Sequence, residues 1–571
     1  MKKGRYILFV VLFFVILGIA AVLSYVLYDF GRPAVAVPAR AYLEVNLSGP
    51  LEEIAPPDFW VSLMLGTRPT AVHDVWLNLR KAAADARIRA VVLRLGMLQG
   101  EWAKMSELRD AVLEFRHSGK KVYAFIEEAP DFDKEYYLAT ACDRIVLHPL
   151  GWLGVNGIGG SVPFLKGTLD KLGIRAEFEH VEDYKTAYNM FTEKGFTPAH
   201  REETEAYLAD IFAEYVRVVA AARGMTETRF RELLDIAFYQ GENAKTAGLV
   251  DDVLYDDELL EQIAEGGRRP NRITLDQYAR VKAVPAGLGG GRRIALIYGV
   301  GPILTGESPP QIMGGTTVAR WLRTARLDPT IKAIVFRVDS PGGSSVGSDV
   351  IGREVFLAKK AKPVVVSMSD VAGSGGYWVA MSAHKIIAQP QTLTGSIGVL
   401  AGKFSLADLY AKLGITSESV AFGAKAEIFS TFRPFTPEER RTLKNEILWT
   451  YDKFVTKVAE GRNMTKEAVH QVGQGRIWTG RQAKERGLVD EIGGLTTAIA
   501  TAKKLAGIAE EEDVSLVIWP KRRSFWETLL GRPAADFGPA SLTELKKALR
   551  MVRLLEEPRV WALMPLGLET R

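Results

Sequence analysis

The feature that most constrains the fold of this 571-residue chain is an internal duplication. The sequence DARIRAVV at 85–92 returns as DPTIKAIV at 328–335, which is 243 residues later. The sequence KLGI at 171–174 returns unchanged after 241 residues, and GLVD at 248–251 returns after 239 residues. Because the offset drifts by only four residues over this distance, the chain contains two diverged copies of one folding unit.

Each copy alternates short β-branched runs with helical patterns, which is typical of an α/β unit with a mostly parallel sheet. In the second copy, 333–338 and 363–367 are predicted strands, 375–382 a helix, and 436–460 a long helix that starts with Thr-Pro-Glu-Glu. A glycine-rich linker at 284–291 separates the copies. We therefore predict an α/β fold of two tandem units, at 40–283 and 292–515, with an amphipathic C-terminal extension at 516–571.

The composition excludes several classes of protein. Apolar residues make up 47% and charged residues 25%, the balance of a globular protein, and a net charge of +5 over this length argues against a nucleic-acid partner. The single cysteine, Cys142, excludes an intrachain disulfide and a cysteine-based metal site. Seven histidines with no His-Glu-x-x-His pair argue against a zincin. We expect neither a metal ion nor a cofactor.

The N-terminus predicts a membrane anchor. Lys2, Lys3 and Arg5 precede an uncharged run from 6 to 28, which as a helix is about 34 Å long and can cross a hydrocarbon core of about 30 Å. The apolar part of a cleavable signal peptide is shorter, so residues 1–31 are predicted as an uncleaved anchor, although small residues at 34–41 leave later cleavage open. Positive charge before the span keeps the first residues cytoplasmic, which puts the rest of the chain on the extracytoplasmic side.

The two copies differ at the ends of two strands. The second copy has the glycine-rich turn DSPGGS at 339–344, where the first copy has GMLQG at 96–100. The second copy also has AGSGGYW at 372–378, and Ser374 in it corresponds to Asp133 of the first copy. The second copy thus combines two glycine turns with a serine at a helix start, and the first copy has lost both features.

This combination suits acyl transfer. A serine in the first turn of a helix lies beside unpaired backbone N–H groups, and glycines let a carbonyl substrate approach the backbone. The N–H of Gly375 and one from the turn at 341–343, assigned to Gly343, could form an oxyanion hole. The alternative is that Ser374 only caps a helix in a tight turn.

A serine nucleophile needs a base. His384 follows Ser374 by ten residues, nearly three turns along one helix, and His470 lies in a charged, surface-like stretch, so neither is convincing. A Ser-x-x-Lys pattern is missing because Tyr377 stands at the lysine position. The base is therefore expected to be a lysine from elsewhere in the fold.

Four motifs together resemble the long, duplicated form of the signal peptide peptidase A family, also called protease IV. They are Ala-x-Ser-Gly-Gly-Tyr-Trp at 372–378, Ser-Pro-Gly-Gly at 340–343, Thr-Gly-Ser-Ile-Gly at 394–398 and Tyr-Lys-Thr-Ala at 184–187. The resemblance runs from the anchor to about residue 515. It implies a Clp-protease/crotonase-like fold for each unit, an anchor in the bacterial cytoplasmic (inner) membrane, and a homotetramer that cleaves apolar peptides such as remnant signal peptides.

The resemblance also implies a Ser–Lys dyad in which Ser374 is the nucleophile and Lys185, from the first copy, is the general base and acid. Ser396 in the third motif is a candidate for orienting the lysine, and its other interpretation is a simple turn residue. Lys425, near the repeat counterpart of Lys185, is a rival base, but it is followed by Ala-Glu-Ile and lacks the hydroxyl residue of the motif.

Two other functions stay open at this point. The chain could be a membrane-tethered, non-catalytic scaffold or acyl-binding protein, since its first copy has lost the serine and both glycine turns. A His-based α/β-hydrolase would need Gly-x-Ser-x-Gly, and Ala372 stands at the first glycine of that pattern.

Overall fold

The computed structural model of the chain describes residues 36–54, 69–264, 268–281, 290–309, 311–521, 561–564 and 569–570. The predicted anchor at 1–31, most of the linker and most of the C-terminal extension lie outside these residues. Among the described residues, no helix has the combination of length and apolar character that a membrane crossing requires.

The first unit is built on a mainly parallel sheet in the order β10-β5-β4-β3-β1-β11, with β2 beside β1. Its strands are β1 Ala41–Glu52, β2 Thr70–Ala71, β3 Ile88–Gln99, β4 Lys121–Ile126, β5 Arg144–Leu147, β6 Trp152–Val155, β7 Gly160–Ser161, β8 Arg175–His180, β9 Ala237–Gln240, β10 Asp252–Val253 and β11 Asn271–Thr274. Its helices are α3 Val72–Ala84, α4 Trp102–Arg116, α5 Asp133–Ala139, α6 Lys166–Leu172, α7 Asn189–Thr192, α8 Pro198–Arg223, α9 Glu227–Ile236, α10 Gly241–Thr246, α11 Asp256–Ile263 and α12 Leu275–Ala279.

The second unit repeats this plan in an eight-stranded sheet in the order β21-β19-β17-β15-β12-β23, with β18 and β22 attached through β17. Its strands are β12 Arg292–Val300, β13 Ile303–Leu304, β14 Met313–Gly314, β15 Ile331–Ser340, β16 Gly342–Ser344, β17 Val364–Gly373, β18 Lys385–Ala388, β19 Leu393–Gly395, β20 Leu400–Ser405, β21 Ile477–Thr479, β22 Glu491–Ile492 and β23 Val514–Trp519. Its helices are α13 Gly315–Leu327, α14 Ser345–Lys359, α15 Gly375–Ala380, α16 Ala407–Lys412, α17 Pro437–Arg462, α18 Lys466–Val472, α19 Gly480–Glu485 and α20 Leu495–Leu505; two short strands, β24 Trp561–Leu563 and β25 Glu569–Thr570, follow.

The predicted duplication is confirmed by matching elements. Helices α8 and α17 are both 26 residues long. Each begins at a proline and is preceded by a threonine whose side chain accepts a hydrogen bond from the third helical N–H. Helices α4 and α14 are both 15 residues long and follow the corresponding strands β3 and β15. The second sheet continues past residue 515, because β23 pairs in parallel with β12 along 514–519.

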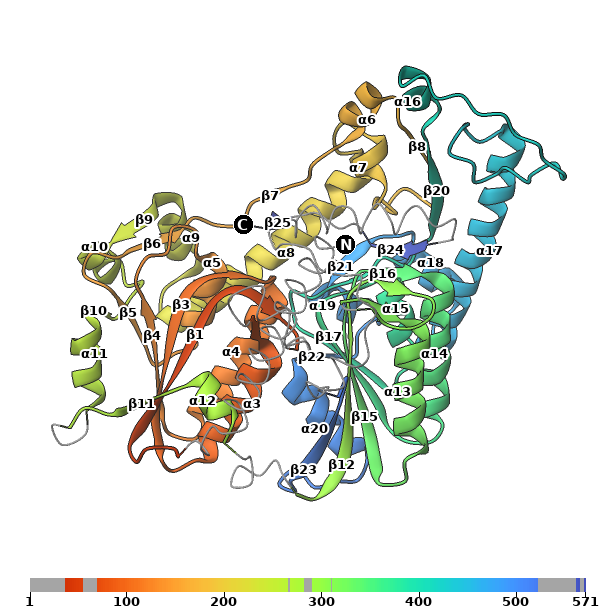
Figure 1. Ribbon diagram of the computed structural model, residues 1–571. Helices are drawn as coiled ribbons and strands as arrows, with labels where there is room; N and C mark the ends of the chain where they lie inside the picture. Colours follow the sequence, from red (N-terminus) through yellow and green to blue (C-terminus); the bar gives the residue numbers. More distant parts are fainter. Residues whose placement is uncertain are drawn as a thin grey trace, which may run out of the picture.

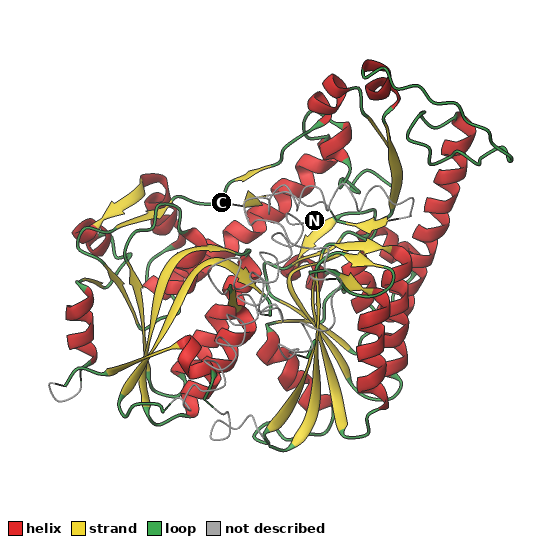
Figure 2. Ribbon diagram, in the orientation of Figure 1, coloured by secondary structure: helices red, strands yellow, loops and turns green. Residues whose placement is uncertain are grey.

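The two sheets lie side by side, with α3, α4 and α20 between them and α13 and α14 on the far face of the second sheet (Figure 1). Figure 2 shows the helices on both faces of the second sheet. The buried apolar residues between the sheets form one cluster that draws on both units. Continuity of the core across the units fixes them relative to one another.

A third sheet joins the two units. Strand β8 of the first unit pairs antiparallel with β20 of the second along six residue pairs, from His180 with Leu400 to Arg175 with Ser405. The arm made of α6, α7 and β8 therefore extends over the second unit, as the upper part of Figure 1 shows. This crossing carries the chain segment that follows β8 to the ends of the second unit's strands.

Candidate active site

Ser374 lies at the junction between strand β17 and helix α15, and its side chain is fully buried. Its backbone has φ 53° and ψ −112°, a conformation that a residue with a side chain adopts only under strain. The Ser374 N–H donates a hydrogen bond to the Gly395 carbonyl at 2.8 Å, which anchors the turn to the next strand.

Lys185 lies in the loop that follows β8, and it is fully buried although it belongs to the first unit. Its Nζ lies 2.8 Å from the Ser374 Oγ. The same Nζ lies 3.0 Å from the Ser396 Oγ and 3.1 Å from the Ser396 carbonyl oxygen. These three oxygens hold the amine against the serine hydroxyl.

The surroundings of this pair favour an uncharged amine. Burial lowers the pKa of Lys185 well below its ordinary value, and the carboxyl of Glu203 only partly opposes this effect. Burial also raises the pKa of Glu203 to about 8, although hydrogen bonds from Thr186 and from the Ile477 N–H favour its charged form. With this pKa, Glu203 is largely protonated at neutral pH and gives little support to a charged Lys185, so the amine can act as a base.

Two glycines make room for the lysine. A Cβ on Gly475, whose φ is +85°, would lie 2.5 Å from the Lys185 backbone nitrogen. A Cβ on Gly398, the last residue of the Thr-Gly-Ser-Ile-Gly motif, would lie 3.0 Å from the Lys185 Cδ. The Gly475 N–H also donates to the Ile397 carbonyl at 2.8 Å, which ties this loop to the motif. Both positions therefore admit only glycine without displacing Lys185.

The second glycine turn lies directly beside the serine turn. Gly343, with φ +146°, passes so close to Ile303 that a Cβ would lie 2.2 Å from the Ile303 carbonyl oxygen. A Cβ on Gly376 would lie 2.4 Å from the carbonyl oxygen of Ser340. Gly375 is the first residue of α15 and Gly343 is the middle residue of β16, so the two proposed oxyanion donors lie on adjacent turns.

A segment from the C-terminal end of the chain lies over this turn. Strand β24 pairs antiparallel with β16, with Ala562 opposite Gly343, and also pairs with β20 through Trp561 and Leu400. The Met564 N–H donates to the Pro341 carbonyl at 2.7 Å, and Met564 is buried against Gly373. An extended segment of the chain thus occupies the place between β16 and β20 in this sheet.

The structure brings the other candidate bases to different places. The Lys425 side chain is 40% exposed, and its Nζ contacts the Thr442 Oγ1 at 2.7 Å and Glu438 at 3.7 Å on helix α17. The prediction that His384 shares a helix with Ser374 is wrong, because α15 ends at Ala380. The His384 Nδ1 accepts a hydrogen bond from the Val364 N–H, and the His470 Nδ1 lies 2.9 Å from the Tyr451 hydroxyl.

In the first unit, an acid takes the place of the nucleophile. Asp133 is buried, and its carboxylate accepts hydrogen bonds from the N–H groups of Asn156 and Gly157 and from the Tyr215 hydroxyl. Burial raises the pKa of Asp133 to about 6. The carboxylate thus ties the start of α5 to the loop after β6 and to helix α8 of the first unit, which has no serine at this position.

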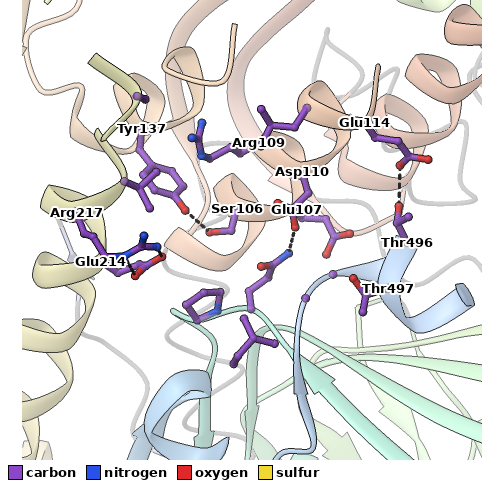
Figure 3. Close-up of a pocket in the computed structure, with 18 of the residues that line it drawn as sticks. Ser106, Glu107, Arg109, Asp110, Glu114, Tyr137, Glu214, Arg217, Thr496 and Thr497 are labelled. Carbon is purple, nitrogen blue, oxygen red and sulfur yellow. Dashed lines mark hydrogen bonds and ion pairs between the residues drawn. The ribbon is translucent and has the colours of Figure 1, made fainter. Parts of the chain in front are cut away.

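A separate pocket of about 890 Å³ lies between the two units, lined by α4 and α8 on one side and by residues near 389–390 and 492–497 on the other (Figure 3). Neither Ser374 nor Lys185 lines it. Within the described ranges, no group of three or more His, Cys, Asp or Glu side chains is arranged to hold a metal ion.

Sequence reasoning missed Glu203 and Gly475. Glu203 lies in the long helix α8 and looks like any charged helical residue, and Gly475 lies 290 residues after the lysine that it accommodates. Only the shared motif pointed to Gly398. The local signal is a pair of glycines, at 473 and 475, between a helix and a strand, which indicates that another chain segment approaches the backbone closely.

Comparisons with known proteins identify the family to which the chain belongs. The sequence matches the family described as Peptidase family S49 over residues 114–268 and 357–509, one region in each unit. The chloroplastic serine protease SPPA of Arabidopsis thaliana is 37% identical over 451 residues, which cover 77% of this chain and 66% of the plant protein, slightly less than two thirds. Protease 4 of Salmonella typhi is 34% identical over 454 residues, 77% of this chain and 73% of that protein. The solved structure of ClpP1 from Listeria monocytogenes is 14% identical over 35% of this chain and 91% of that chain, with a TM-score of 0.23.

Proposed function

Because this chain belongs to peptidase family S49 and is thereby a serine peptidase, we propose that it is an endopeptidase whose catalytic dyad is Ser374 and Lys185. The observation that carries the proposal is the 2.8 Å contact between the Lys185 Nζ and the Ser374 Oγ in a fully buried setting. A charged lysine at such a position would be costly, whereas a neutral amine is a base of suitable strength.

In the proposed reaction, neutral Lys185 takes the proton of the Ser374 hydroxyl while the serine oxygen attacks a peptide carbonyl. The N–H groups of Gly343 and Gly375 stabilise the negative charge on the carbonyl oxygen of the tetrahedral intermediate. Lys185, now protonated, gives its proton to the leaving amine and becomes neutral again, which leaves the acyl group on Ser374. Lys185 then activates water, whose attack releases the acid product and returns the proton to the serine. Ser396 orients the amine through its hydroxyl and carbonyl oxygens.

The proposed substrates are apolar peptides in extended conformation. Support comes from strand β24, which runs antiparallel to β16 beside the oxyanion turn, as a bound peptide would. The buried Met564, packed against Gly373 next to the nucleophile, indicates room for an unbranched apolar side chain there. Remnant signal peptides are apolar and fit this description.

The proposal also includes the anchor, the crotonase-like unit fold and a homotetramer. The anchor rests on the uncharged run at 6–28, with the catalytic part on the extracytoplasmic side of the bacterial cytoplasmic membrane. The tetramer is supported by repeat symmetry: the first unit's arm covers the second unit, while the equivalent segment of the second unit exposes 88% of Val420 and 94% of Phe422. A second copy of the chain is the partner that the symmetry favours for this segment.

The test combines cleavage and labelling. Purified protein in detergent should cleave an internally quenched apolar peptide and should be labelled by a fluorophosphonate probe, with mass spectrometry locating the label on Ser374. The Ser374→Ala variant should lose both signals while its thermal unfolding stays close to that of the wild type. Equal cleavage by Ser374→Ala would refute the assignment, and absence of both activities in the wild type would favour the non-catalytic scaffold.

A further inference from the structure

Helix α4 of the first unit contacts the second unit along one face. The Gln389 side-chain amide donates to Asp110 at 2.8 Å, and the Thr496 hydroxyl donates to Glu114 at 3.0 Å. Figure 3 shows the labelled side chains of Asp110 and Glu114 directed from this helix toward the second unit, each with a dashed contact. The N-terminal turn of the same helix continues this face toward the active site and presents Lys104.

Lys104 is a buried cation between two carboxylates of the second unit. Its Nζ lies 2.8 Å from the Asp339 Oδ2 and 3.1 Å from the Asp370 Oδ2, and its side chain is only 10% exposed. The backbone N–H of Lys104 also donates to the Asp370 Oδ1 at 2.8 Å. Burial alone would lower the pKa of Lys104, but Asp339 and Asp370 hold it well above its ordinary value. Lys104 is therefore charged and bridges the two acids.

The two acids lie at the base of both catalytic turns. Asp339 precedes the turn that begins at Ser340 and leads to Gly343, and Asp370 lies four residues before Ser374. Strands β15 and β17 pair Val338 with Met368 and then Ser340 with Ala372. Asp339 of β15 therefore lies opposite three residues of β17, at 369–371. This bulge is bridged by the Asp339 side chain, whose Oδ1 accepts a hydrogen bond from the Val371 N–H at 3.1 Å. Bulges of this kind aim the strand ends that follow them.

From this arrangement we propose that Lys104 is a positioning residue for catalysis: by neutralising Asp339 and Asp370 together, it holds the β15–β17 bulge in the shape that sets Gly343 opposite Ser374. The inference rests on the proposed function of Ser374. Lys104 is then a second contribution of the first unit to the reaction, separate from Lys185. It does not contact the substrate and acts by fixing the distance between the nucleophile and the oxyanion donor. Without the Lys104 ammonium group, the Asp339 and Asp370 carboxylates would face one another with no cation between them. Their repulsion would move the ends of β15 and β17 apart.

The neighbouring charges do not replace Lys104. Arg337, another buried cation of this interface, is engaged by Glu53 through two nitrogens and by Glu107 through a third contact at 3.0 Å. The cluster of Glu53, Glu107, Asp339 and Asp370 thus has four carboxyl groups for the two cations Arg337 and Lys104. Removal of Lys104 leaves Asp339 and Asp370 dependent on a guanidinium that already binds two other acids.

The test variant is Lys104→Met, which keeps the apolar stem and removes the charge. We expect kcat to fall about 10- to 100-fold with KM within about twofold of the wild type, because an error well below 1 Å in the oxyanion hole acts on the transition state rather than on binding. The matched control is Lys81→Met, which removes another buried lysine, one that donates to the Asn78 side chain and the Tyr278 carbonyl, both in the first unit. This control should lose stability and keep its kcat.

The decisive comparison is the double variant Lys104→Met/Asp370→Asn. It removes one of the two facing charges and keeps an oxygen that can accept the backbone N–H of residue 104, so kcat should return to within about fivefold of the wild type. A merely structural role for Lys104 predicts no such recovery. Wild-type kcat in Lys104→Met, or a folded double variant that stays as slow as the single variant, would overturn the proposal. If Lys104→Met does not fold, the kcat of the double variant alone decides. Ser374→Ala, measured in parallel, reports separately on whether Ser374 is the nucleophile.

Discussion

The substitution Gly475→Ala tests how closely the first unit's lysine is fitted to the second unit. The Cβ of alanine would lie 2.5 Å from the Lys185 nitrogen, 2.6 Å from its Cα and 2.7 Å from its Cβ. All three are atoms that a side-chain rotation cannot move away. Ordinary contacts of carbon start at about 3.5 Å, so the loop that carries Lys185 would have to retreat by about 1 Å.

The magnitude follows from the geometry of the dyad. The Lys185 Nζ lies 2.8 Å from the Ser374 Oγ, and a retreat of about 1 Å would break that hydrogen bond. Misplacement of this size costs about 100-fold in rate when it separates reacting groups. We therefore expect kcat/KM of Gly475→Ala to fall about 100-fold. The left-handed backbone at this position adds a stability cost of about 1 kcal/mol, which is independent of the clash.

The control for that backbone strain is Gly487→Ala. Gly487 has φ +75°, close to the +85° of Gly475, and a Cβ there would meet nothing within 4 Å. Both variants should lose similar stability in thermal unfolding, and only Gly475→Ala should lose peptide cleavage and the rate of probe labelling. Activity of Gly475→Ala within threefold of the control would refute the view that Lys185 acts from its observed position.

Three further predictions concern charge, access and the rival base. Burial raises the folded-state pKa of Glu203 to about 8, above its unfolded value. The contribution of Glu203 to stability is therefore complete at low pH and is lost as the pH rises through 8. Glu203→Gln should raise the unfolding temperature relative to the wild type more at pH 9 than at pH 6. Deletion of 561–571 should increase the rate of Ser374 labelling and of peptide cleavage, because β24 lies between β16 and β20 where substrate is proposed to bind; an unchanged rate would contradict this arrangement. Lys425→Ala should leave cleavage within about twofold of the wild type, since its Nζ contacts α17; strong loss of activity would return Lys425 as a candidate base.

The repeated fold could be predicted because its helices and strands follow from local sequence patterns. The helix predicted at 436–460 is α17, and its first turn follows the Thr-Pro-Glu-Glu start, in which Thr436 and Glu439 cap each other's backbone groups. The end of strand β17 was harder to predict, because the strand continues six residues beyond the apolar run at 363–367. Ser369 and Asp370 interrupt the apolar pattern there, and they are buried because they meet Glu53 and Lys104 of the other unit. A sequence pattern cannot distinguish such residues from a solvent-exposed turn.

The candidate site divides in the same way. Ser374, Gly343 and Gly375 belong to glycine-rich turns at strand ends, which have a chemical interpretation on their own. Lys185 could be predicted only through a motif shared with a known family. The residues that flank a lysine in the sequence do not indicate that it is buried against a residue 189 positions away. Glu203, Gly475 and Lys104 act through contacts between the units, and such contacts depend on how the two copies dock.

The central claim is that the base comes from the first unit and the nucleophile from the second. The most direct measurement is the rate at which a fluorophosphonate labels Ser374 in Lys185→Met and in Lys425→Met, at equal concentrations of folded protein. Loss of a general base predicts a labelling rate about 1,000-fold lower in Lys185→Met and a rate close to the wild type in Lys425→Met. Normal labelling of Lys185→Met together with loss of labelling in Lys425→Met would contradict the account and make the second unit self-sufficient.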